Sequence, residues 1–134
     1  MSVHVRLRVG AESYALPVEH VLEVAELGEI TPVPGSPRAV LGVRNLRGEV
    51  LPVFDLAAVF GIERDGAAGR LLVAEHAGRR AGFAIDEVTD VGELSAPAEE
   101  TESQFLRGAA LDEGELVGVV DMQRVFAALQ EGQV

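Results

Sequence analysis

Hydrophobic and polar residues alternate along much of the chain, which predicts short strands that are buried on one face. Near the N-terminus, Val3, Val5, Leu7 and Val9 alternate with polar side chains. This period of two is typical of a half-buried strand. A turn containing Gly follows and the alternation resumes, so a β-hairpin is predicted over residues 3–18. Further strands are predicted at residues 39–44, 48–54, 71–74, 80–85 and 115–120.

Helices are predicted to be few and short. Asp55 is well placed as the N-cap of a helix over residues 56–60, and Gly61 as the residue that ends it. Asp121 is placed in the same way before a final helix that reaches about Leu129. The remaining assignments are one helical turn at residues 18–22, a proline-rich loop at 31–38 and an acidic loop at 93–104.

Three blocks of sequence occur twice in the same order, which indicates an internal duplication. The matched pairs are Val18–Val24 with Ile85–Val91, Leu46–Gly48 with Leu106–Gly108, and Val50–Phe60 with Leu116–Phe126. One offset of about half the chain predicts two similar halves rather than a solenoid. Pro52 and Gly118 interrupt equivalent strands, so both halves are expected to bend there. Many short, bent strands favour two small barrels over a flat sheet.

Composition and charge exclude several classes of protein. A chain of 134 residues is expected to form one domain or two small subdomains with a shared core. The absence of cysteine excludes disulfides and thiolate chemistry, and no apolar run approaches the ~20 residues of a membrane span. The net charge of −11, with no basic stripe, disfavours nucleic acid. Five Phe and one Tyr also offer few side chains for base stacking.

Residues that could carry out catalysis are scarce. The three histidines have no ligand spacing, so neither a metal nor a cofactor is expected. Asp55 and Asp121 form a symmetric pair that could share a proton as acid and base. On that hypothesis the chain is a small-molecule-binding or hydrolytic protein that uses the seam between its halves. Helix capping explains each aspartate without catalysis, so an enzyme is the weaker interpretation.

The segment Gly42–Leu56 resembles the signature of the CheW family of chemotaxis coupling proteins. It contains the family's N-L-R-G-x-x-x-P-[hydrophobic]-x-D-L pattern intact, and the other repeated blocks fall in family order. The resemblance implies a mainly β fold of two pseudo-symmetric five-stranded β-barrel subdomains with a few short helices. Together they would form a single CheW-like domain over residues 1–134. The halves are expected at roughly 15–66 and 67–134, with strand exchange possible at the termini.

The same resemblance implies a non-catalytic cytoplasmic adaptor. It would link the tip of a methyl-accepting chemoreceptor to the regulatory domain of the CheA histidine kinase, without a cofactor and without inserting into the membrane itself. A scaffold in a pilus or gliding pathway is the alternative within the family. The isolated protein is expected to be mainly monomeric, because its surfaces are reserved for partners and its charge opposes self-association.

The resemblance also assigns contact residues for the receptor and kinase. The matching positions are Val21, Glu23, Gly42, Asn45, Arg47, Val88 and Val91. For the three valines the alternative is packing in the core, and for Gly42 it is a need for positive φ or a close approach of strands. Arg47 is expected at an exposed turn with Glu23 as its ion-pair partner, and Arg107 is expected to be its repeat.

Overall fold

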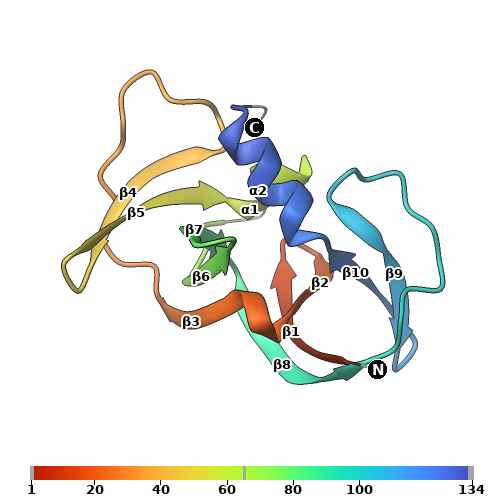
Figure 1. The fold of residues 1–134 in the computed structure, drawn as a ribbon. Helices are drawn as coiled ribbons and strands as arrows, with labels where there is room; N and C mark the ends of the chain where they lie inside the picture. Colours follow the sequence, from red (N-terminus) through yellow and green to blue (C-terminus); the bar gives the residue numbers. More distant parts are fainter. Residues whose placement is uncertain (1, 65, 133–134) are drawn as a thin grey trace.

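The computed structural model describes residues 2–64 and 66–132, whose strands form two five-stranded sheets (Figure 1). The terminal sheet has the order β8-β1-β2-β10-β9 and the central sheet has the order β3-β6-β7-β5-β4. The strands of the terminal sheet are β1 (Ser2–Val9), β2 (Glu12–Pro17), β8 (Glu87–Leu94), β9 (Leu106–Asp112) and β10 (Glu115–Val120). Those of the central sheet are β3 (Val21–Glu26), β4 (Val40–Leu46), β5 (Glu49–Asp55), β6 (Arg70–His76) and β7 (Arg79–Ile85). The helices are the short 3-10 helix η1 (Val18–His20), α1 (Leu56–Phe60) and α2 (Met122–Gln130).

The mainly β class and the pair of five-stranded sheets are confirmed, but the sheets are not closed barrels. Among the described residues, β8 does not pair with β9, and β3 does not pair with β4. Irregular register occurs in the pairings of all four edge strands. Bulges of this kind bend a strand and increase its local twist.

The two halves of the chain exchange strands. The β1–β2 hairpin lies in one sheet with β8, β9 and β10 from the second half, pairing with β8 and β10, while the β6–β7 hairpin lies with β3, β4 and β5 from the first, pairing with β3 and β5. Each exchange creates one parallel pair, β2 with β10 and β7 with β5. The central sheet therefore contains every strand from Val21 to Ile85, and the terminal sheet contains the strands on either side of it.

The pseudo-symmetry is clearest where each sheet leads into its helix. The Asp55 amide donates to the Ala39 carbonyl at 2.8 Å, and the Asp121 amide donates to the Phe105 carbonyl at the same distance. Each aspartate side chain then accepts a hydrogen bond from the first turn of the following helix. Asp55 and Asp121 therefore begin equivalent helices, as the duplication predicts.

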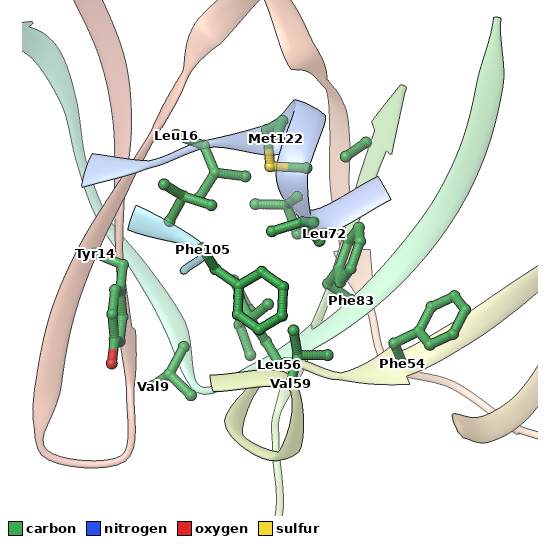
Figure 2. Close-up of a cluster of buried hydrophobic side chains, with 14 of the residues drawn as sticks. Val9, Tyr14, Leu16, Phe54, Leu56, Val59, Leu72, Phe83, Phe105 and Met122 are labelled. Carbon is green, nitrogen blue, oxygen red and sulfur yellow. The ribbon is translucent and has the colours of Figure 1, made fainter. Parts of the chain in front are cut away.

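A shared apolar core lies between the two sheets (Figure 2). Leu16 comes from the terminal sheet and Phe83 from the central sheet, and Phe126 of α2 lies 6.0 Å from Phe83 between ring centroids. Each sheet also encloses a smaller cluster of its own, with Val117 in the terminal sheet and Leu51 in the central sheet. In Figure 1 helix α2 lies between the two sheets, where its apolar face covers the shared core.

Candidate functional site

Two of the four edge strands have open outer edges. A bridge between Thr31 and Val43 covers the edge of β4, and a bridge between Glu99 and Ala109 covers the edge of β9. Within residues 2–64 and 66–132, no strand or bridge covers the outer edge of β3 or of β8. Both strands lie along the lower side of the molecule as drawn in Figure 1. Unpaired strand edges are natural places for another chain to bind.

The open strands carry bulges at equivalent places in the duplication. In β3 the register shifts between Val21 and Glu23, so Leu22 is the extra residue. In β8 the extra residue is Thr89, whose hydroxyl donates to the Arg6 carbonyl at 3.3 Å. A bulge changes the direction in which neighbouring side chains point and hinders pairing of the strand with a copy of itself. These edges are therefore open without being regular templates for aggregation.

Four of the seven expected contact residues lie in these two strands, and they differ in how deeply they are buried. Val21 and Val88 are half-buried and pack against the shared core, as the alternative interpretation anticipates. Val91 is 56% exposed, so core packing does not explain it. Glu23 is half-buried on β3 and forms an ion pair.

Arg47 lies in the two-residue turn between β4 and β5. Arg47 and Gly48 both have positive φ, 51° and 86°, as a type I′ hairpin turn requires. The Asn45 side-chain oxygen accepts a hydrogen bond from the Gly48 amide at 3.0 Å, which stabilises the turn. The Arg47 side chain is 69% exposed and pairs with Glu23, so both expectations for this arginine are confirmed.

Gly42 is buried and occupies a position that no other residue can fill without strain. Its φ is +145°, and a Cβ there would lie 2.1 Å from the Thr31 carbonyl oxygen. The expectation of a close approach between strands is therefore confirmed. Gly42 shapes β4 through its backbone and presents no side chain to a partner.

The expected repeat of Arg47 at Arg107 is wrong. Gly108 has a φ of +149° and a Cβ there would lie 2.6 Å from the Glu99 carbonyl oxygen, so it is the counterpart of Gly42. The counterpart of Arg47 is Glu113, with a φ of 49° at the first position of the β9–β10 turn. Arg107 is instead the extra residue in the bulge of β9, where it lies 3.7 Å from Asp121.

Asp55 and Asp121 do not form an acid–base pair among the described residues. Asp55 accepts from the Ala57 amide at 3.1 Å and pairs with Arg64, whereas Asp121 accepts from the Arg124 amide at 3.2 Å. An open cavity of about 750 Å³ is lined in part by Asp55, but Asp121 does not line it. The helix-cap interpretation is therefore confirmed for both residues.

One exposed apolar pair escaped the sequence analysis. Leu111 of β9 lies opposite Leu116 of β10, and they are 63% and 56% exposed on the outer face of the terminal sheet. Their counterparts in the central sheet are Asn45 and Val50, which also lie opposite one another. The alternation of Leu116 with the buried Val117 was visible in the sequence and places Leu116 on the exposed face. The strand register that brings Leu111 opposite Leu116 was not visible there.

Within residues 2–64 and 66–132, two further kinds of site are absent. No helix in this part of the chain is both long and apolar enough to cross a membrane. No group of three or more histidine, aspartate or glutamate side chains is placed there to hold a metal ion. The unpaired outer edges of β3 and β8, together with the exposed β4–β5 turn, make up the candidate site.

Comparison with known proteins places the chain in a family. A family model described as a CheW-like domain matches residues 4–130. "Chemotaxis protein CheW" of Rhizobium meliloti is 33% identical over 132 residues, which cover 91% of this chain and 85% of that protein. "Protein FrzA" of Myxococcus xanthus is 42% identical over 83 residues, or 60% of this chain and 52% of the relative.

A solved structure is similar over nearly the whole length. The crystal structure of the scaffolding protein TtCheW from Thermoanaerobacter tengcongensis aligns with a TM-score of 0.83 and 28% identity, covering 93% of this chain and 92% of that one. The sequence and the three-dimensional structure agree on the same family over this length. The chain belongs to the CheW-like domain family.

Proposed function

We propose that this protein is a non-catalytic adaptor that couples methyl-accepting chemoreceptors to a CheA-type histidine kinase in a bacterial chemosensory array. The observation that carries the proposal is the match to the CheW-like domain over residues 4–130. The similarity to a protein described as a scaffold supports it. So does the surface, which offers open strands and exposed apolar side chains suited to protein partners.

The receptor-binding surface is proposed to include β3, β8 and the β4–β5 turn. Val21, Val88 and Val91 would supply apolar contact, and the exposed Val91 would be buried on binding. Arg47, paired with Glu23, would be the polar anchor at the centre of this surface and would fix the orientation of the receptor hairpin. Asn45 and Gly42 complete the set by holding the turn and the shape of β4.

A kinase-binding surface is proposed to lie at the β9–β10 end of the terminal sheet. The kinase regulatory domain is expected to be CheW-like itself, so the ends of related sheets would meet. Leu111 and Leu116 are the strongest candidates in the terminal sheet, since both leucines are more than half exposed.

Location, assembly and pathway follow from this role. The protein would reside in the cytoplasm and reach the inner membrane through its partners. Its net charge of −11 favours a monomer in isolation. A pilus or gliding pathway stays the alternative output, because relatives named FrzA and PilI are 42% and 37% identical to this chain, each over 60% of its length.

A binding experiment with two matched variants tests the proposal. Wild-type protein is mixed separately with receptor-containing membranes and with a purified CheA regulatory domain. Val91→Asp should abolish sedimentation with the receptor and leave kinase binding intact, while the double change Leu111→Asp with Leu116→Asp should do the reverse. Wild-type protein that binds neither partner would overturn the proposed function. The same result from both variants would overturn the separation of the two surfaces.

A further inference from the structure

The chain passes between the two sheets at two places. The first crossing runs from β2 through η1, Val18–His20, into β3. The second is a single residue, Asp86, between the end of β7 at Ile85 and the start of β8 at Glu87. Asp86 is therefore the point at which the chain leaves the central sheet and enters β8, one of the two open edge strands.

A buried arginine holds this second crossing to the central sheet. The Arg64 side chain is only 9% exposed, and its Nη1 lies 3.0 Å from Asp55 Oδ1. Its Nη2 donates to the Ala84 carbonyl at 3.3 Å. Its Nε lies 3.0 Å from Asp86 Oδ1, out of line for a hydrogen bond, so this contact is Coulombic. Arg64 thus joins the ends of β5 and β7 to the crossing residue.

Asp86 continues the connection into the terminal sheet. Its second carboxylate oxygen accepts a hydrogen bond from the Gly10 amide at 3.2 Å, and its own amide donates to the Arg8 carbonyl at 3.1 Å. Gly10 lies in the β1–β2 turn, where a Cβ would be 2.8 Å from the Glu63 carbonyl oxygen. The turn therefore packs directly against the segment that carries Arg64, and the contacts from Arg64 through Asp86 to Gly10 span both sheets.

The duplicated half of the molecule has no equivalent of this arrangement among its described residues. Asp121 corresponds to Asp55, and its arginine partners are Arg107 and Arg124 at 3.7 and 3.5 Å. Both of these side chains are 59% exposed. Neither is bonded to a crossing between the sheets. Arg64 is therefore not a general feature of the repeat but a contact made only at the crossing that leads into β8.

We propose that Arg64 is a positioning residue for partner binding. It fixes the direction of β8 relative to the central sheet, so that Val88 and Val91 keep their place with respect to β3, although Arg64 touches neither valine. The consequence for binding rests on the proposed receptor surface, whereas the geometric part does not. A guanidinium suits this role because it presents five donors in a rigid planar fork, whereas a lysine ammonium is a compact point charge on a flexible stem.

The experiment measures geometry and binding separately. Arg64→Lys retains the charge and loses the fork. Arg64→Gln with Asp86→Asn removes the connection without leaving Asp86 charged and unpaired, so that folding is preserved. Arg124→Gln is the control, since it removes an arginine that also pairs with an N-cap aspartate. Spin labels at Glu26→Cys in β3 and Glu93→Cys in β8 report the distance between the strands, and the chain has no cysteine of its own to interfere.

Each outcome has a definite meaning. Both Arg64 variants should broaden or shift the distance between the labels and weaken receptor binding about tenfold, with kinase binding and the control unchanged. An unchanged distance overturns the inference whatever happens to binding. A changed distance with unaltered receptor affinity overturns the positioning role. If wild-type protein binds no receptor, the proposed function fails, while the distance measurement still decides whether Arg64 holds β8.

Discussion

Gly42 and Gly108 occupy equivalent bulges, and each leaves room for a carbonyl oxygen where a side chain would begin. The oxygen near Gly42 belongs to Thr31 and the oxygen near Gly108 belongs to Glu99. These same two residues form the bridges that cover the outer edges of β4 and β9. The two glycines therefore determine which edges are covered, and β3 and β8 are left open.

Gly42→Ala should destabilise the fold strongly. A methyl group would overlap the Thr31 oxygen at 2.1 Å, and alanine disfavours a φ of +145°. Strain and overpacking together should cost about 3 kcal/mol or more. Urea denaturation measures this loss. Gly114→Ala is the control, because Gly114 also has positive φ but no atom within 4 Å, so its cost should be only about 1 kcal/mol. Equal costs at the two sites would contradict this account.

Arg47→Ala should leave the melting temperature nearly unchanged and weaken receptor binding at least about twentyfold. The ion pair with Glu23 involves a largely exposed arginine, so its loss should cost about 0.2–1 kcal/mol of stability. An arginine at the centre of an interface contributes more, about 2 kcal/mol. A thermal melt and a pull-down with receptor-containing membranes measure the two effects. Early unfolding would show that Arg47 is structural, and unchanged binding would remove it from the site.

Much of the fold can be predicted from local sequence patterns, and the strand that was not predicted contains a bulge. The β1–β2 hairpin and the helix Leu56–Phe60 match the predictions, because alternation and capping are local signals. The turn predicted at residues 18–22 is a 3-10 helix that ends at His20, followed at once by β3. The bulge at Leu22 places two apolar residues in succession, which imitates helical spacing and hides the strand.

The candidate site was predictable only at the positions that the resemblance to the family assigns. Arg47 and Glu23 pair as expected. The false match of Arg107 with Arg47 arose because the bulge of β9 puts an arginine before Gly108, which imitates the turn motif. Leu111 and Leu116 were missed since an exposed leucine gains meaning only from the register that places another beside it.

Asp55→Ala should cost more stability than Asp121→Ala, although both residues cap equivalent helices. Loss of the cap alone should cost about 1 kcal/mol, as expected for Asp121. Asp55 also pairs with the buried Arg64, so its loss should cost about 3 kcal/mol in total. Chemical denaturation of both variants measures the difference. Equal costs would mean that the contact with Arg64 adds nothing to stability.

Tyr14 should ionise only when the protein unfolds in alkali. Burial raises the pKa of its phenol, and the hydrogen bond to the Glu12 carboxylate and the charge of that group raise it further. In the unfolded chain the phenol ionises near pH 10. Its contribution to stability is therefore fully present below about pH 10 and is lost as the pH rises toward the folded-state pKa.

Absorbance of the phenolate tests this directly, because Tyr14 is the only tyrosine and the chain has no tryptophan. The phenolate signal should rise together with the loss of β-structure seen by circular dichroism, above the pH at which free tyrosine ionises. Tyr14→Phe should cost about 1 kcal/mol at neutral pH for the lost hydrogen bond. It should also make stability fall less steeply with pH in alkali, since no phenol is left to ionise on unfolding. A phenolate signal near pH 10 with the secondary structure intact would show that Tyr14 is neither buried nor held by Glu12 in solution.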